Sequence, residues 1–279
     1  MRIYSWNVNG IRSATKNGFG DWFKNASPEV LCLQETRAEE NSLSDDIRMP
    51  EGYFCFWNSS KKKKGSNGTA ILSQIEPDAV EYGFGIDEFD EEGRVVQLVF
   101  PDWVLNSICF PSGNRGEERV DFKLRFYDAF LDNCLGWLRR GRHVVTLGDY
   151  KACHTELDIA CPQDNEEENV FLPVERAWID KYIAAGFEDT FRALHPDEAG
   201  AYTWWPGKAA VREKNEGFRV DCAFVDSGIL PNVTGAQIYP QVLGSDHCPI
   251  SVDLELPFPP IAKEDTIISD RGTRKNPVI

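Results

Sequence analysis

The sequence lacks any apolar run long enough to cross a membrane and has no paired cysteine spacing. A span needs about eighteen or more consecutive apolar residues, and the start MRIYSWNVNG enters a strand-like pattern without the charged and then apolar segment of a leader. We therefore expect a cytoplasmic protein. The eight cysteines are scattered along the 279 residues, which is typical of reduced thiols and argues against a disulfide framework or a zinc cluster.

Basic residues are too few to balance the acidic ones. The chain has 30 Lys and Arg against 45 Asp and Glu, a formal net charge of −15. A field of this sign repels phosphates at long range, so a nucleic-acid partner requires local basic patches. The four lysines at 61–64 form such a run, and they predict either a solvated hairpin tip or a phosphate-steering loop.

Short apolar runs alternate with helical stretches along the chain. The runs expected as strands are 2–8, 29–35, 68–73, 93–100, 103–110, 143–149, 219–225 and 248–256, and the helical stretches are 121–140 and 174–186. This mixture predicts an α/β protein. We expect one domain over residues 1–256. Residues 257–279 contain prolines and charges without an amphipathic period, which predicts an extended or mobile C-terminal extension.

Polar side chains stand at or beside the ends of several predicted strands. These residues are Asn7, Glu35, Asp149, Asp221, Asp246 and His247. One such Asp or Glu is more often a turn or cap residue, but polar groups at several strand ends form a cleft in layered α/β folds. Carboxylates hold hard cations, and a histidine paired with an aspartate suits phosphate chemistry. The set predicts hydrolysis of a phosphodiester.

Six segments carry a resemblance to a known family. They are SWNVNGIR, LCLQET, NGTAIL, LGDYKACHTELDI, GFRVDCAFV and GSDHCPI. In this order they resemble the exonuclease III and abasic-site endonuclease family over residues 1–256. The resemblance implies a four-layered α/β sandwich, with two mixed sheets face to face, helices outside and the site at one edge. It also implies a DNA repair nuclease, a monomer away from membranes, that uses Mg²⁺ or Mn²⁺ and cuts duplex DNA at abasic sites or 3′ ends.

The resemblance also assigns roles around an ion and a water molecule. Glu35 resembles the metal-binding glutamate of the family. Asn7 and Asp246 match positions beside it, in the shell of the metal or supporting it. Asp149 resembles the carboxylate that positions or activates the attacking water.

Other matched positions concern the phosphate and the substrate. His247 resembles the histidine that hydrogen-bonds the scissile phosphate, and Asp221 resembles its orienting partner. This is the familiar arrangement of a base held by a third group. The substrate-side matches are Arg12 and Arg115 for the nucleic-acid backbone, and Trp204 and Phe218 for an aromatic wall. A Trp packed in the core is the commoner alternative for such aromatics.

Three positions depart from the family pattern. Lys151 stands where relatives have an asparagine that helps to hold water and phosphate. Because residues two apart on a strand share a face, we expect Lys151 against Asp149. There it either weakens Asp149 as a base or acts as a second cation. We expect Lys151→Asn to speed turnover, and an unchanged or lower rate would mean that the lysine takes part in the mechanism. A Lys151 ammonium in the place of the metal would contradict the hydrolase prediction.

The other two departures are Cys109, in place of a tyrosine, and Ser112, in place of an amide. A thiol is a poor donor, and loss of one transition-state hydrogen bond costs about a hundredfold or more in rate. A second class therefore stays open, the RNA-associated regulators without nuclease activity that resemble the catabolite repression control proteins of pseudomonads. Those proteins have substituted acidic positions, whereas this chain keeps the whole set, so we favour an enzyme with reduced or altered activity. A phosphodiesterase for a small or lipid substrate is a third alternative, against which the WW and PSG blocks and Arg115 count.

Overall fold

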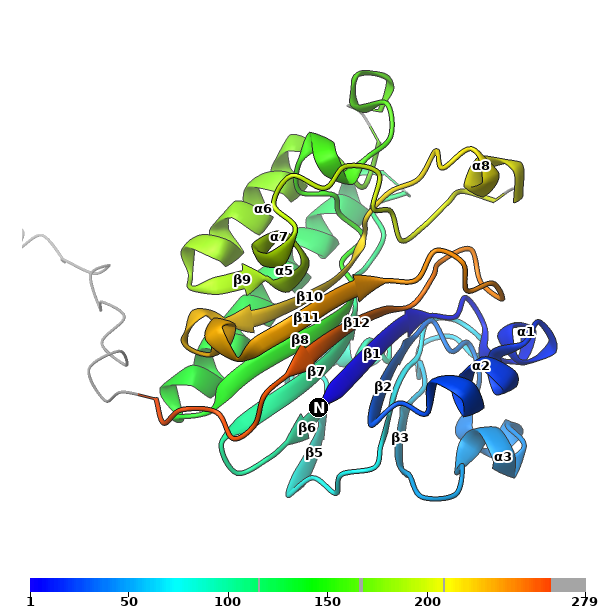
Figure 1. Ribbon diagram of the computed structural model, residues 1–279, viewed down its shortest axis with the longest axis vertical. Coiled ribbons are helices and arrows are strands. Elements are labelled where there is room, and N and C mark those ends of the chain that lie inside the picture. The colour runs from blue at the N-terminus through cyan, green and yellow to red at the C-terminus, as the bar shows by residue number, and fades with distance from the viewer. Residues whose placement is uncertain (115, 166–167, 208, 262–279) are drawn as a thin grey trace, which may run out of the picture.

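Two six-stranded sheets form the centre of the computed structural model, which describes residues 1–114, 116–165, 168–207 and 209–261 (Figure 1). The first sheet has the order β11 (Val233–Ile238), β12 (Ile250–Leu254), β1 (Arg2–Asn7), β2 (Val30–Gln34), β4 (Thr69–Ser73) and β3 (Phe54–Asn58). The second has the order β5 (Ala79–Tyr82), β6 (Val95–Val99), β7 (Trp103–Cys109), β8 (His143–Asp149), β10 (Asp221–Asp226) and β9 (Phe187–Asp189). Both sheets are mixed, because β1 and β2 are parallel, as are β7 and β8, while the other pairs are antiparallel.

Helices cover the outer faces of both sheets (Figure 1). The helices of the described residues are α1 (Ile11–Lys16), α2 (Phe19–Ala26), α3 (Asp45–Arg48), α4 (Asp87–Asp90), α5 (Glu117–Arg139), α6 (Pro173–Ala184), α7 (Thr190–Leu194) and α8 (Ala209–Glu213). Those that pack on the outer faces are α1 and α2 on the first sheet and α5 and α6 on the second. The two helices expected from the sequence correspond to α5 and α6. No helix of the described residues is long and apolar enough to cross a membrane.

Three buried clusters lie between the layers. One lies between the sheets and contains Ile3 of β1 and Leu147 of β8. A second packs the outer face of the first sheet against α1 and α2. The third packs the outer face of the second sheet against α5 and α6, with Phe126 and Trp178 among its members. The predicted four-layered α/β sandwich is therefore confirmed.

Packing continues past the expected domain boundary at residue 256. Phe258 is buried against the ring of Trp103, and the carbonyl of Pro259 accepts a hydrogen bond from Nε2 of His143 at 2.7 Å. On its other side the His143 ring contacts the Asp226 carboxylate at 3.0 Å. Burial lowers the pKa of His143, but the hydrogen bond and charge of Asp226 outweigh it and raise the pKa above its ordinary value. The extension beyond residue 261 lies outside the described residues.

This histidine makes stability depend on pH. A histidine whose pKa is raised by folding stabilises the protein fully below its unfolded pKa, and this contribution is lost as the pH rises through the folded-state pKa. The melting temperature of the wild type should therefore exceed that of His143→Asn most below about pH 6.5 and by less above it. Thermal unfolding of both proteins over a pH series checks this, and an advantage that grows with pH would contradict it.

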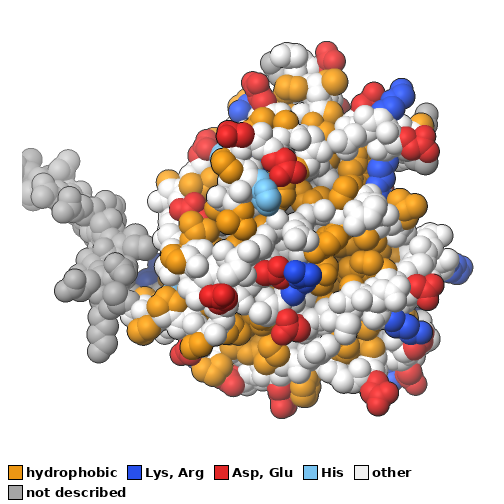
Figure 2. Space-filling model, viewed as in Figure 1, with side chains coloured by type: hydrophobic (Ala, Val, Ile, Leu, Met, Phe, Trp, Pro, Cys, Tyr) orange, Lys and Arg blue, Asp and Glu red, His pale blue; other side chains and the backbone are white. Residues whose placement is uncertain are grey.

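The surface is mainly acidic, as the net charge of −15 requires. Figure 2 shows acidic side chains spread over one face with basic side chains between them. Two lysines of the 61–64 run lie next to acids, Lys62 at 3.6 Å from Glu92 and Lys64 at 3.1 Å from Glu39. These pairs reduce the charge that the run can offer to a phosphate.

Candidate active site

Strand alternation brings polar side chains of both sheets together between the sheets. Asn7 points to the same side of β1 as Ile3, and Asp149 to the same side of β8 as Leu147, because residues two apart share a face. Cys109 and Asp221 are the register partners of Asp149 on the neighbouring strands β7 and β10. All four side chains are almost completely buried.

A polar layer separates these residues from the apolar core between the sheets. Ser5 donates a hydrogen bond to Gln34 at 3.2 Å, and Gln34 donates to Ser107 at 3.1 Å, which links β1, β2 and β7. Gly148 allows β7 and β8 to approach closely beside the site, since a Cβ there would lie 1.8 Å from the carbonyl oxygen of Ile108. The site therefore stands on a rigid support.

His247 is held by one aspartate and faces another. Its Nδ1 donates a hydrogen bond to Oδ2 of Asp221 at 2.8 Å, and its Nε2 lies 3.9 Å from Oδ2 of Asp149. Burial lowers the pKa of His247, but the charge and hydrogen bond of Asp221 raise it more, so the pKa lies above its ordinary value. Burial also raises the pKa of Asp221. The predicted orienting role of Asp221 has the required geometry.

Lys151 lies between the two acidic groups expected to serve the metal and the water. Its Nζ is 2.6 Å from Oε1 of Glu35 and 2.6 Å from Oδ2 of Asp149. Burial lowers the pKa of Lys151, but the two carboxylates outweigh it and leave the pKa well above its ordinary value. Burial raises the pKa of Glu35, and Lys151 outweighs this effect, so the pKa of Glu35 lies well below its usual value.

The expected contact of Lys151 with Asp149 is confirmed, but the expected reason for it is wrong. Strand β8 ends at Asp149, and Lys151 has a φ of 52°, in the left-handed region. Its backbone N–H donates to Oδ1 of Asp149 at 3.0 Å. A turn beyond the strand, and not the alternation of side chains along it, brings the ammonium back onto the carboxylate.

Two groups of side chains in the described part of the chain have ligand atoms close enough to share a metal ion. They are Glu35, Cys109 and Asp149, and Asp149, Asp221 and His247, with the atoms of each group within 4.8 Å of one another. In the first group, however, Lys151 and the Asn7 amide nitrogen both bridge the same carboxylate oxygens. Asn7 Nδ2 donates to Asp149 at 2.6 Å and to Glu35 at 3.2 Å, while its Oδ1 accepts from the N–H of Asn9.

Arg37 takes the other oxygen of Glu35. The carboxylates of Glu35 and Asp149 are thus both surrounded by hydrogen-bond donors. The amide oxygen of Asn7 does not face these carboxylates. As arranged, these residues do not fit a divalent ion, which needs free oxygen ligands at about 2.0–2.6 Å. From the sequence, a Lys151 ammonium in the place of the metal is expected to contradict a hydrolase. What its position contradicts directly is the binding of a metal ion between Glu35 and Asp149.

A buried ion pair supports the loop that carries Lys151. Lys123 of α5 and Glu175 of α6 are both fully buried and paired with each other. Nζ of Lys123 also donates to the carbonyl oxygen of Lys151 at 2.7 Å. The backbone of Lys151 is therefore held in place by α5, through Lys123, and by α6, through Glu175.

The roles expected for Cys109 and Ser112 stay predictions, and the structure places Cys109 beside Glu35 and Asp149. The Cys109 thiol is fully buried, and burial raises its pKa to about 12. Its sulfur accepts a weak hydrogen bond from Nη1 of Arg94 at 3.9 Å. Ser112 accepts from the N–H of Asn114 at 3.3 Å, a local contact.

The burial of Cys109 predicts slow reaction with thiol reagents, because the thiolate is the reactive form. Iodoacetamide should modify Cys161, the cysteine that is exposed, well before Cys109, which should react only after unfolding. Mass spectrometry of peptides from native and denatured protein checks the order. Rapid labelling of Cys109 in the native protein would contradict its placement.

The predicted aromatic wall lies beside His247. The rings of Trp204 and Phe218 are 5.2 Å apart, and Trp204 is 6.0 Å from the His247 ring. Phe218 is mostly buried, whereas Trp204 is partly exposed. Nε1 of Trp204 donates to Asp246 at 3.0 Å, which ties the wall to the site.

The carboxylate oxygens of Asp246 accept hydrogen bonds from neighbouring side chains. Besides Trp204, it accepts from Nδ2 of Asn9 at 2.8 Å and from the hydroxyl of Ser245 at 3.2 Å. It belongs to neither of the two candidate metal groups, so the metal role expected for it stays a prediction. Arg12 is an exposed residue that contacts Ser42, away from the buried cluster. Arg115 lies outside the described residues.

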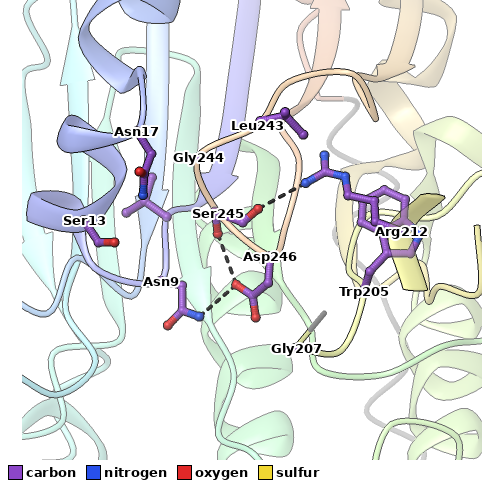
Figure 3. A pocket seen from close by; sticks show the side chains of 11 residues that line it. Asn9, Ser13, Asn17, Trp205, Gly207, Arg212, Leu243, Gly244, Ser245 and Asp246 are labelled. Atoms are coloured by element: carbon purple, nitrogen blue, oxygen red, sulfur yellow. Dashed lines mark hydrogen bonds between the residues drawn. The ribbon is translucent and has the colours of Figure 1, made fainter. Parts of the chain in front are cut away.

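A cavity of about 700 Å³ adjoins the site through Asn9 and Asp246 (Figure 3). Figure 3 shows Arg212 on the far side, where its guanidinium donates to the carbonyl of Ser245 at 3.1 Å. The guanidinium also lies 4.4 Å from the ring of Trp205. The cavity thus lies next to the buried cluster, and its wall combines polar groups and the Arg212 cation with apolar side chains such as Trp205 and Leu243.

Three contributors were missed from the sequence. Asn9, which holds Asp246, stands inside the SWNVNG segment and could have been found there. Arg37 follows Glu35 by two residues, but its contact depends on the left-handed backbone at both positions. Arg94 reaches the carbonyl oxygens of Cys109 and Phe110, and no sequence signal marks it.

The protein has two facing mixed sheets, and carboxylates and a histidine cluster at the ends of their strands. This architecture and this site are those of the α/β-sandwich phosphodiesterases. Residues 4–247 match the model of the Endonuclease/Exonuclease/phosphatase family. The chain belongs to this family, as the resemblance predicted.

Relatives and solved structures agree with this assignment. The chain is 39% identical over 255 residues to the DNA repair nuclease APEX1 of Danio rerio, covering 91% of this chain and 82% of that protein. It is 36% identical to the exodeoxyribonuclease of Bacillus subtilis, covering 92% of this chain and 100% of that protein. The structure of the Xenopus laevis APE2 catalytic domain superposes with a TM-score of 0.81 at 27% identity, covering 91% of each chain.

Proposed function

We propose that the protein hydrolyses phosphodiester bonds in DNA, at abasic sites or at 3′ ends, and leaves a 3′-hydroxyl. The observation that carries the proposal is the convergence of Asp149 and His247 on one point, with Asp221 behind the histidine. Two relatives that are 39% and 36% identical to this chain over the aligned residues are named as a DNA repair nuclease and an exodeoxyribonuclease. Both names support DNA as the substrate.

Each residue of the cluster has a task that its position allows. Asp149 orients the attacking water, and the amide of Asn7 holds this carboxylate in place. His247 is charged more readily than an ordinary histidine because of Asp221, and its Nε2 donates to a phosphate oxygen. Lys151 adds positive charge where charge develops on the phosphate. The cavity beside Asp246 accommodates substrate beyond the reacting group.

The resemblance implies Mg²⁺ or Mn²⁺ at Glu35, with Asn7 and Asp246 nearby. When bound, such an ion polarises a phosphate oxygen and stabilises the leaving oxygen. No step described above passes through an ion, because the side chains at Glu35 do not fit one as arranged. A monomer in the cytoplasm, acting on duplex DNA, completes the proposal.

One observation favours a second candidate, a regulator that binds RNA without cutting it. The Lys151 ammonium neutralises the charges of Glu35 and Asp149 together. A protein that does not catalyse a reaction can tolerate this neutralisation, because it needs neither carboxylate for a metal or a water. The intact pairing of His247 with Asp221 favours the enzyme.

A cleavage assay separates the two candidates. Duplex DNA with one abasic analogue is incubated with wild type and with Glu35→Ala, in Mg²⁺, in Mn²⁺ and in chelator. Cleavage by the wild type that Glu35→Ala lacks is the expected result. Tight binding of single-stranded RNA, with no cleavage of the DNA in any condition, would favour the regulator.

A further inference from the structure

We infer that Lys151, together with Arg37, replaces the divalent ion of this site, so that the protein acts on a phosphate with a cation tethered to its own chain. The inference rests on the proposed hydrolysis of phosphodiesters. It concerns which groups supply the positive charge of that same site. If Lys151 and Arg37 supply it, the site does not require a bound divalent ion.

The carboxylate oxygens that face each other across the two sheets are already bridged. Oε1 of Glu35 and Oδ2 of Asp149 share Lys151 Nζ, at 2.6 Å from each. They also share Asn7 Nδ2, at 3.2 and 2.6 Å. A divalent ion that used both oxygens would have to displace one of these donors.

The charges of the cluster balance without an ion. Glu35 and Asp149 contribute two negative charges, and Lys151 and Arg37, which contacts Oε2 of Glu35, contribute two positive ones. A divalent ion would contribute the same two charges. Adding one while both cations remain in place would leave an excess of positive charge beside the buried Asp149, which is unfavourable.

The position of the ammonium is built by several contacts and is not a chance rotamer of a long side chain. The N–H of Lys151 donates to Oδ1 of Asp149, and its carbonyl accepts from Lys123. Its left-handed φ of 52° costs energy in a residue with a side chain. Since Lys123 is itself paired with the buried Glu175, the turn is held from both helices.

The ammonium has one donor to spare. An ammonium group has three N–H donors, and its partners among the described residues are Glu35 and Asp149. The side chain of Lys151 keeps 18% of its surface exposed. The third N–H is therefore not used by either carboxylate and is the donor that the inference assigns to a phosphate oxygen.

Calorimetric titration with Mn²⁺ alone tests the exclusion of the ion without any need for activity. The proteins are wild type, Lys151→Asn, and Lys151→Asn combined with Glu35→Gln. We expect Lys151→Asn to bind Mn²⁺ at least about tenfold more tightly than wild type, which corresponds to 1.4 kcal/mol, and the double variant to lose this gain. Bound Mn²⁺ should also raise the melting temperature of Lys151→Asn by mass action, while that of the wild type stays unchanged.

Equal Mn²⁺ affinity of wild type and Lys151→Asn, lost with Glu35→Gln, would overturn the inference. Failure of Lys151→Asn to gain any affinity would overturn it too, because the lysine would then not be what excludes the ion.

A rate measurement tests whether Lys151 also takes over the catalytic role of the ion. Wild type should cleave abasic-site DNA at the same rate in chelator and in Mg²⁺. In chelator, Lys151→Asn should be slower by about a hundredfold or more, as for loss of one electrostatic donor, and Lys151→Arg should recover part of the rate. Wild-type cleavage that stops in chelator would overturn the inference. If no protein cleaves in any condition, the proposed hydrolysis fails, while the Mn²⁺ titration still decides whether Lys151 excludes the ion.

Discussion

Asp149→Asn should lower the single-turnover rate of abasic-site DNA cleavage by about a hundredfold to ten-thousandfold, the range for removal of a general base. The substitution keeps the size of a fully buried side chain but removes the charge that orients water and receives Lys151 and Asn7. Quenched-flow cleavage with enzyme in excess measures the chemical step.

The control is Asp45→Asn, which removes a carboxylate that is 83% exposed and whose ionic partner among the described residues is Arg48 of its own helix. Its rate should equal that of the wild type. Affinity for the abasic duplex, measured by fluorescence anisotropy, should change little in either variant, because Asp149 acts on the reacting water. A rate for Asp149→Asn within about tenfold of wild type, well below the contribution expected of a general base, would show that another group activates the water.

Glu175→Gln should destabilise the protein by about 3–5 kcal/mol, the cost of removing one partner of a buried ion pair. Glu175 and Lys123 are both inaccessible to solvent. Burial raises the pKa of Glu175 and lowers the pKa of Lys123, so each charge depends on the other. Urea unfolding gives the free energy of unfolding of each variant.

A matched exposed pair joins α5 and α6 as well. Lys181 and Asp128 are about half exposed and 2.7 Å apart, so Lys181→Met should cost less than about 1 kcal/mol. Lys123→Met combined with Glu175→Met should recover much of the stability lost by Glu175→Gln, since an apolar pair of similar size often replaces a buried ion pair without loss. A loss below about 1 kcal/mol for Glu175→Gln would contradict the burial of this pair.

The strands that the sequence did not predict are the four edges of the sheets. They are β3, β5, β9 and β11. Central strands such as β2 and β4 are buried on both faces and read as continuous apolar runs. Edge strand β5 has no buried residue, and β11 is only partly covered. β5 and β11 need no apolar run, because only one side of an edge strand is paired and part of it faces water. This reason does not hold for β3, whose sequence FCFWN is an apolar run.

The site was predictable to the extent that it depends on strand ends. Asn7 and Asp149 were found because each stands at the end of a buried strand. Asp221 was expected within the predicted strand 219–225, whereas it is the first residue of β10. The course of the chain beyond those ends was not predictable. Glu35 and Lys151 both have a left-handed φ, of 49° and 52°, and this local turn decides that the ammonium meets both carboxylates. Contacts over long sequence separations, such as that of Lys123 with Glu175, give no periodic signal at all.

The most direct test of a lysine-filled cation position is a crystal of the wild-type protein grown with Mn²⁺ and measured at a wavelength where manganese scatters anomalously. We predict electron density for the Lys151 ammonium between Oε1 of Glu35 and Oδ2 of Asp149, and no anomalous peak there. A manganese peak bound to these two oxygens, with the lysine side chain turned away, would contradict it.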